Sequence, residues 1–207
     1  MFNQINILTP FSRKENKDVL IQHLEPFNIQ WYPIIHEDID FGSKDWIHPV
    51  KVTLPPFVVD YCYFKLNQFL YTIPIKPKEY YLFLCDDDFY EDDFFMKLRP
   101  YLIRDGALPV IVSMKRGIPG SHPTSKHSTT TLIADRANMC IDKIGLEQII
   151  LRGDILDRVR FMNWSGADGI LAQLIAESPD VIYLPDIYVY FNYLEKGRWQ
   201  KINKSKS

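Results

Sequence analysis

The sequence predicts an α/β fold: a three-layer sandwich around a mostly parallel central sheet. Short apolar runs of strand length alternate with longer segments of helical spacing along the chain. One run, Tyr80–Cys85, is almost wholly apolar, as expected for a central strand that is buried on both faces. The chain has 207 residues, 46% of them hydrophobic, with no internal repeat or linker. We therefore expect one domain spanning residues 1–207.

The first half of the chain alternates strands and helices. The expected elements are a strand at Ile5–Leu8, a helix within 16–25, a strand at Ile29–Ile35, a helix within 58–72 and the strand Tyr80–Cys85. The first strand ends at Thr9-Pro10, and the second ends in a polar cluster that includes Glu37 and Asp38. Loops that follow parallel strands meet at one edge of a sheet, where ligands bind in such folds.

The second half repeats the pattern less regularly. The expected elements are a helix starting near Glu91-Asp92-Asp93, a strand at Pro109–Met114, a helix within 142–151, a helix starting near Gly166–Gly169 and a strand at Val181–Leu184. Residues 115–131 are rich in Gly, Pro, Ser and Thr and predict a flexible loop, either a functional lid or a disordered segment. Residues 200–207 read as a basic tail.

Composition narrows the classes of partner and the compartment. A formal net charge of −2 and a pI of about 6.2 give no basic field for nucleic acid. No apolar stretch is long enough to span a bilayer, and the first residues lack signal-peptide features. Three widely spaced cysteines predict reduced thiols and a cytoplasmic protein. Four lysines between 196 and 206 predict a solubilising tail, with peripheral contact to an anionic membrane as the alternative.

The carboxylate run Asp86-Asp87-Asp88 directly follows the buried strand at 80–85. Three adjacent negative charges repel one another, and a divalent cation such as Mn²⁺ or Mg²⁺ would relieve that repulsion while bridging to a phosphate. Because side chains alternate along a strand, Asp86 and Asp88 are expected to face one side and Asp87 another. The competing interpretation is an exposed acidic turn or helix cap, reinforced by the nearby pair Asp92 and Asp93.

The stretch YYLFLCDDDFYEDDFF resembles the Asp-X-Asp segment of GT-A-type glycosyltransferases, particularly family 2 and its relatives. The order of elements is similar too, from INILTPFSR at the start to WSGADGILAQLI near the end, so the resemblance covers roughly residues 5–192. It implies a GT-A-like (Rossmann-like) fold, a nucleotide-sugar donor, a saccharide or other hydroxyl acceptor, and a divalent metal.

The resemblance also implies residue roles. Asp168 matches the catalytic base of inverting members, although a helix-cap role is equally open. The donor-binding positions are Thr9, Pro10, Arg13, Asp38, Lys65, Asn67, Asp86, Asp87 and Asp88, with Asp86 and Asp88 also on the metal. Trp164 is a candidate for stacking on a sugar ring.

Two departures from the family pattern affect this hypothesis. Ala167 stands where many relatives have Glu, and no His follows His127 to complete a metal shell, so Asn192 is the candidate replacement ligand. Two other functions stay open. One is a nucleotidyltransferase or pyrophosphorylase, although TPFSRKEN lacks the glycines typical of that loop. The other is a degenerate, non-catalytic module that binds a nucleotide sugar.

Overall fold

The computed structural model describes residues 3–56, 61–102, 108–116, 130–164 and 166–191. These residues form one nine-stranded sheet in the order β3-β2-β1-β4-β8-β6-β9-β5, with β7 paired to β6. The strands are β1 (Ile5–Pro10), β2 (Gln30–Ile35), β3 (Val50–Lys51), β4 (Tyr80–Phe83), β5 (Phe89–Tyr90), β6 (Val110–Arg116), β7 (Thr130–Leu132), β8 (Ile149–Arg152) and β9 (Ile182–Phe191). The α-helices are α1 (Lys17–Leu24), α2 (Tyr61–Thr72), α3 (Phe94–Leu98), α4 (Gly153–Leu156) and α5 (Ala167–Ala176).

The longest strand pairings are parallel. β1 lies between β2 and β4 with both neighbours parallel to it, and β6 runs parallel to β9 over seven paired positions. The antiparallel strand β8 joins these two halves, pairing with β4 on one side and β6 on the other. The predicted mostly parallel α/β sheet is confirmed.

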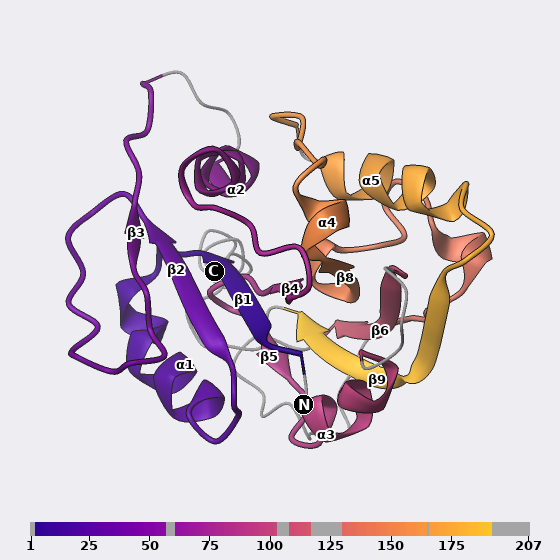
Figure 1. Ribbon diagram of the computed structural model, residues 1–207, viewed down its shortest axis with the longest axis horizontal. Coiled ribbons are helices and arrows are strands. Elements are labelled where there is room, and N and C mark those ends of the chain that lie inside the picture. Colours follow the sequence, from indigo (N-terminus) through magenta and orange to yellow (C-terminus); the bar gives the residue numbers. More distant parts are fainter. Residues whose placement is uncertain (1–2, 57–60, 103–107, 117–129, 165, 192–207) are drawn as a thin grey trace, which may run out of the picture.

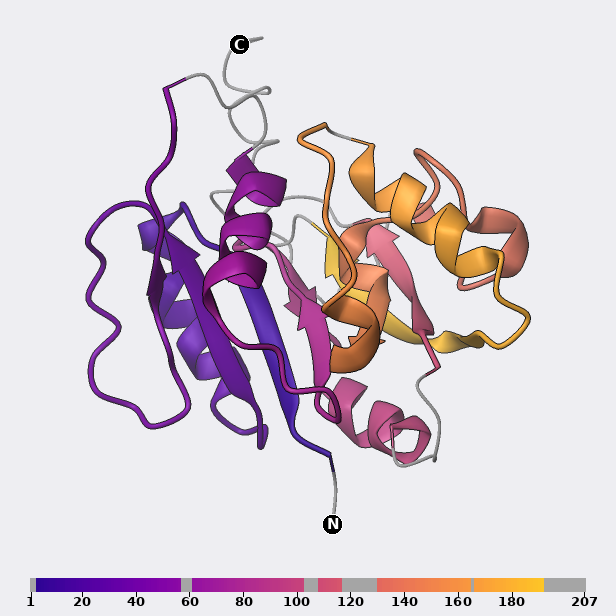
Figure 2. The same ribbon diagram turned by 45° about the horizontal axis from the view of Figure 1, so that its top comes forward.

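Helices cover both faces of the sheet, as predicted for a three-layer sandwich (Figures 1 and 2). On β4, Tyr80 and Leu82 point into one buried cluster, while Tyr81 and Phe83 point into a second. The first cluster is closed by α1 and α3, and the second by α2, α4 and α5. This alternation between two cores explains why the strand reads as a continuous apolar run.

Most of the predicted elements are confirmed. The strands at the start of the chain, the helices at 16–25 and 58–72, the central strand at 80–85 and the helix after Gly166 all form, within a few residues of the expected bounds. The short helix α3 follows Asp93 as predicted. The late strand is longer than expected, because β9 continues past Leu184 to Phe191.

The helix predicted within 142–151 is wrong. Residues Leu146–Gln148 form a single 3₁₀ turn, and Ile149–Arg152 form strand β8. Ile150 packs into one buried cluster, whereas Ile149 and Leu151 pack into the other. A short run buried on both faces satisfies a helical spacing as well as a strand, so periodicity alone misleads here.

Strands also enter both ends of the predicted loop at 115–131, because β6 ends at Arg116 and β7 begins at Thr130. Residues 117–129, the basic tail at 200–207 and Asn192 lie outside the described residues. Within the described ranges, every helix is too short or too polar to cross a bilayer.

Candidate functional site

The site forms where β1 and β4 end side by side. The two strands are parallel and paired through Leu8 and Phe83, so the segments that follow them leave the sheet together. Phe11–Arg13 follow β1, and Cys85–Asp88 follow β4. Asp88 N donates to the carbonyl oxygen of Cys85 at 3.1 Å, so the chain turns at the carboxylates and does not continue as a strand.

The Asp86 carboxylate faces the loop after β1. Its Oδ2 accepts hydrogen bonds from the backbone N–H groups of Ser12 (2.5 Å) and Arg13 (2.6 Å), and its Oδ1 accepts one from the Arg13 guanidinium. Arg13 also lies 3.1 Å from Oδ1 of Asp87. Burial lowers the pKa of Arg13, but Asp86 and Asp87 outweigh that effect and leave it raised, so the guanidinium is a permanent counter-charge to both carboxylates.

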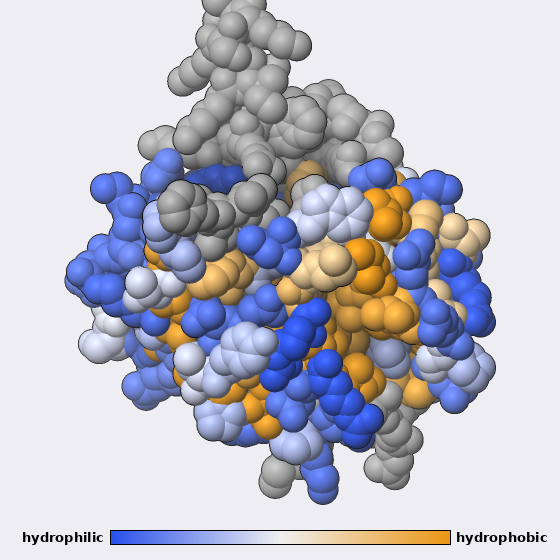
Figure 3. Space-filling view, turned by 90° about the horizontal axis from the view of Figure 1, so that it is seen from above, coloured by the Kyte–Doolittle hydropathy of each residue, from blue (hydrophilic) through white to orange (hydrophobic). Residues whose placement is uncertain are grey.

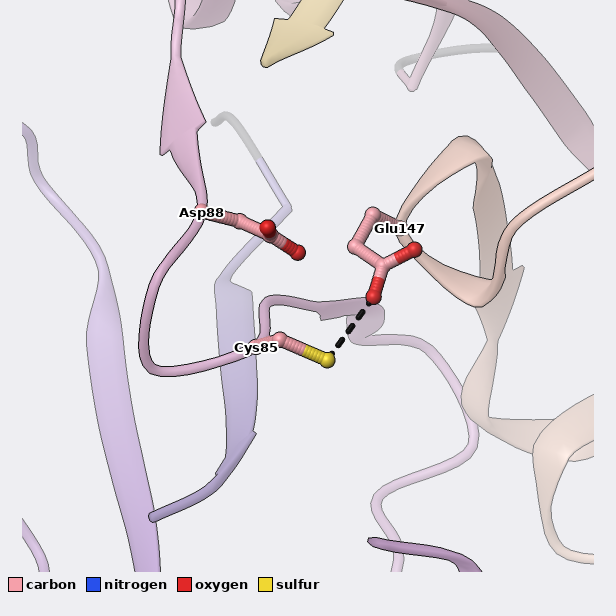
Figure 4. A group of neighbouring side chains, drawn as sticks. All are labelled: Cys85, Asp88 and Glu147. Carbon is pink, nitrogen blue, oxygen red and sulfur yellow. Dashed lines mark hydrogen bonds between the residues drawn. The ribbon is translucent and has the colours of Figure 1, made fainter. Parts of the chain in front are cut away.

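Asp88 faces a different set of neighbours. One ligand atom from each of Cys85, Asp88 and Glu147 lies within 4.8 Å of the others (Figure 4). Asp86 shares Arg13 with Asp87 and is not part of this group, so the expectation that strand alternation would bring Asp86 and Asp88 to one side is wrong. The turn that begins at Cys85 is the reason, because side-chain alternation holds only in extended chain.

Cys85 takes part in this group as a thiol. Its Sγ donates to Oε1 of Glu147 at 2.8 Å. A hydrogen bond with Cys62, burial and the charge of Glu147 raise the pKa of Cys85 well above its ordinary value. Because a protonated thiol is a poor metal ligand, the oxygens of Asp88 and Glu147 are the donors suited to a hard cation such as Mg²⁺ or Mn²⁺. All three cysteines are free thiols, as predicted.

Asp168 lies in the first turn of α5, where its Oδ1 accepts from Gly169 N at 2.8 Å. Burial raises the pKa of Asp168 to about 6, and the negative charge of Glu147 adds to the effect. The Tyr63 hydroxyl, which donates to this carboxylate, opposes the rise. Glu147 therefore lies next to Asp88 and also acts on Asp168, which links the acidic turn to the start of α5.

Lys65 is fully buried behind the loop after β1. Its Nζ donates to the carbonyl oxygen of Phe11 at 2.6 Å and to Oγ of Ser12 at 2.7 Å. Burial lowers the pKa of Lys65 to about 8. Lys65, on α2, therefore holds the loop that carries Arg13.

The other predicted donor-side residues make contacts within the protein. Thr9 is fully buried, and its Oγ1 accepts from the Trp31 indole at 2.9 Å. Pro10 is buried at the end of β1. Asp38 is exposed and lies 2.6 Å from the Lys51 ammonium.

Asn67 and Trp164 also have clear structural positions. The Asn67 side chain holds the main chain of Phe161 through two hydrogen bonds, at 2.7 and 2.8 Å, and so ties α2 to the segment before α5. Trp164 is 47% exposed shortly before α5. A donor or sugar contact for either residue stays a prediction.

Sequence reasoning missed Glu147 and Tyr63. A signal for Glu147 was present, because it is a charged residue inside the apolar segment IGLEQIIL, and it is only 4% exposed. A carboxylate buried at that level usually has a specific partner or function. Tyr63 had no such signal, since an aromatic residue on a helix face is normally core.

The fold is that of a GT-A-type α/β domain, as the sequence resemblance predicted. The chain is similar to the crystal structure of TarS 1–349 of S. aureus, a GT-A-type glycosyltransferase, with a TM-score of 0.63 and 14% identity over 90% of this chain and 60% of that chain. It is similar to the complex of that protein with UDP-GlcNAc at a TM-score of 0.59 and 15% identity, over 91% of this chain and 58% of that one.

A second kind of structure shares the fold. The crystal structure of 4-diphosphocytidyl-2C-methyl-D-erythritol synthase matches with a TM-score of 0.53 and 10% identity, over 100% of this chain and 98% of that one. The chain thus spans about three fifths of the TarS 1–349 chain, 36% of the longer TarS chain and nearly all of the synthase. No protein-family model matches the sequence, and no curated protein matches it.

Proposed function

We propose that this chain is a glycosyltransferase that moves a sugar from a nucleoside-diphosphate-sugar donor to a hydroxyl acceptor. The observation that carries the proposal is the placement of Glu147, which adjoins Asp88 and also raises the pKa of Asp168. Donor-side and acceptor-side carboxylates thereby belong to one site. The likeness to TarS, whose structure includes a complex with UDP-GlcNAc, supports a nucleotide sugar as the donor.

The donor side would consist of the acidic turn and the loop after β1. Asp86 and Asp87 orient Arg13, and Lys65 fixes Phe11 and Ser12 beside it. This arrangement supports a role for Arg13 at the diphosphate, because a guanidinium forms paired hydrogen bonds with phosphate oxygens. Thr9, Pro10, Asp38 and Asn67 remain predictions for the nucleotide side.

A divalent metal fits the site at Asp88 and Glu147. Mg²⁺ and Mn²⁺ are commonly held by one or two carboxylates together with substrate phosphates. Asp86 fits less well as a ligand, because Arg13 and two backbone N–H groups already engage its oxygens. When bound, the metal would supply positive charge to the diphosphate leaving group. Asn192 stays a prediction as a further ligand.

The acceptor side would be Asp168. With a pKa near 6, this carboxylate is mostly ionised at neutral pH and basic enough to accept a proton from an acceptor hydroxyl as the new sugar–oxygen bond forms. Tyr63 and the Gly169 N–H hold its orientation. The same contacts stabilise the first turn of α5, so the structural and the catalytic roles are compatible.

Donor binding is tested by thermal unfolding with UDP-, GDP-, CMP- and dTDP-sugars, each with and without Mn²⁺. We expect one nucleotide sugar to raise the melting temperature more in the presence of Mn²⁺. Asp88→Ala and Glu147→Gln should each remove that metal-dependent increase, whereas Asp92→Ala, an exposed neighbour in the sequence, should keep it. The absence of any shift with all four donors would argue against transfer.

The same experiment with nucleoside triphosphates separates the rival function. Stabilisation by CTP or another triphosphate, and none by a nucleotide sugar, would favour a nucleotidyltransferase. The similarity to the synthase is the reason to test that alternative. For the chemical step, Asp168→Asn should keep donor binding and lower turnover by about 10²–10⁴-fold, the usual contribution of a general base. Donor binding without turnover in the unmodified protein would instead indicate a binding module. The cytoplasmic location predicted from composition remains a prediction.

A further inference from the structure

A cavity of about 440 Å³ opens beside α5. One face of that helix, the end of α4 and the segment after α4 line it, mainly through Ile155, Val159, Phe161, Ile170, Leu171 and Leu174. Its volume falls in the range of small-molecule sites, which run from about 300 to 1,000 Å³. None of the carboxylates of the candidate donor and acceptor site belongs to its lining. The cavity is therefore distinct from those carboxylates, although Ala167, the neighbour of Asp168, lines it, and an inference about its ligand does not depend on the proposed function.

Large hydrophobic side chains stay exposed at its edge. Met162 is 57% exposed and Leu174 is 59% exposed, although both line the cavity. Figure 3 looks onto this side of the molecule and shows hydrophobic residues gathered on the side of α4 and α5, with strongly hydrophilic residues next to them. Contiguous exposed apolar surface around a hollow is a mark of a binding site for an apolar group.

Two arginines give the cavity a positive side. Arg158 and Arg160 both contribute to the lining. Arg160 donates to the main-chain carbonyls of Asp157 and Val159, and its guanidinium lies 4.9 Å from the ring of Tyr71. Within the described ranges, neither arginine forms an ion pair with a carboxylate. Their charges are thus available to an anion at the mouth of an otherwise apolar hollow.

We propose that this cavity binds a single-chain anionic amphiphile, with the apolar chain against α5 and the phosphate or carboxylate group on Arg158 and Arg160. An apolar ligand without charge would leave the arginines unused, and a cationic one would be repelled by them. The hollow shape favours one inserted chain over the flat surface of a bilayer. Phe161, which lines the cavity, stacks on Tyr63 with 5.6 Å between the ring centroids. Tyr63 in turn contacts Asp168, so Phe161 and Tyr63 connect a ligand in the cavity to Asp168.

The test is calorimetric titration with dodecyl phosphate below its micelle concentration, compared with dodecyl maltoside and dodecyltrimethylammonium. Dodecyl phosphate should bind at least tenfold more tightly than either of the other two. Arg158→Gln should weaken dodecyl phosphate binding by about tenfold, the worth of one charged hydrogen bond, and leave the maltoside unchanged. Ile170→Trp, which fills the cavity, should abolish binding of both. Lys78→Gln removes the same charge from an exposed site elsewhere and should bind as the unmodified protein does.

Several outcomes would overturn the proposal. Equal affinity for the three head groups would remove the role of the arginines, and unchanged binding in Ile170→Trp would remove the cavity. If the protein sediments with phosphatidylglycerol vesicles but does not bind monomeric dodecyl phosphate, this face binds a membrane surface and not a single amphiphile. Self-association that Leu174→Glu abolishes would show a contact between copies. Thermal unfolding of each variant checks its fold, and the donor screen is read separately, so either proposal can fail alone.

Discussion

Replacing Asp168 by Asn should stabilise the protein at neutral pH while lowering the turnover expected from the proposed function. The folded structure raises the pKa of Asp168 from 3.8 to about 6, mainly through burial. Between pH 4 and 6 the folded protein therefore holds a proton that the unfolded chain has released, so stability falls as the pH rises through that window. At 1.36 kcal/mol for each pKa unit, the full penalty above pH 7 is at most about 3 kcal/mol. Partial contact with water reduces it, and we expect about 1–2 kcal/mol.

Urea unfolding of the unmodified protein and of Asp168→Asn, at pH 4 and at pH 8, measures this difference. Asn is neutral at both values and can still accept from Gly169 N. The variant should gain about 1–2 kcal/mol over the unmodified protein at pH 8 and little or nothing at pH 4. A variant that is less stable at pH 8, or a difference that does not change with pH, would refute the idea that the structure holds this carboxylate in a strained, ionised state.

Two further predictions concern Arg13, in the loop after β1, and Gly153, at the start of α4. Arg13→Gln removes the guanidinium from two buried carboxylates and should lower the free energy of unfolding by about 2–4 kcal/mol, whereas Lys14→Gln, at an exposed neighbour, should change it by less than about 0.5 kcal/mol in the same urea titration. Gly153→Ala would place a Cβ 2.1 Å from the carbonyl oxygen of Lys76 and should cost about 1–3 kcal/mol or more, measured by thermal unfolding. In Gly166→Ala the new Cβ meets only the ring of Trp164, an exposed side chain that can move. An equal loss of stability in both glycine variants would therefore contradict the predicted clash between Gly153→Ala and the Lys76 carbonyl.

The fold was predictable where each element carries its own local signal. Tyr80–Phe83 alternate between two cores and read as one apolar run, and α5 combines helical spacing with a glycine before its first turn. The strand Ile149–Arg152 was not predictable in this way. Its strand conformation depends on pairing with β4 and β6, which lie about 70 and 40 residues earlier in the chain. The two-residue strand β5 is held by β9 and by a hydrogen bond from Tyr90 N to His23, which no local pattern encodes.

The candidate site was predictable by position but not by partner. Strand order placed the acidic turn at the carboxyl edge, near the loop that carries Arg13, and the structure brings both together. Which carboxylate meets which neighbour depended on a turn at Cys85 that the sequence did not reveal. Glu147 lies in a segment that was predicted to be helical but forms a 3₁₀ turn before strand β8. Its position at the site therefore followed only from the arrangement of the sheet.

The distribution of charge changes the argument for a cation. Three adjacent carboxylates suggest that a metal must neutralise Asp86 and Asp88 together. In the structure Arg13 serves Asp86 and Asp87, and the remaining like-charge conflict is between Asp88 and Glu147, both almost fully buried. Two buried carboxylates with oxygens within 4.8 Å are stable only with a shared proton, a donor such as the Cys85 thiol, or a cation. The diphosphate of the proposed donor would bring two more negative charges to this edge, which a proton or a thiol cannot balance. Under the proposed function the need for a metal would therefore arise with the donor, and metal affinity should depend on the presence of the nucleotide.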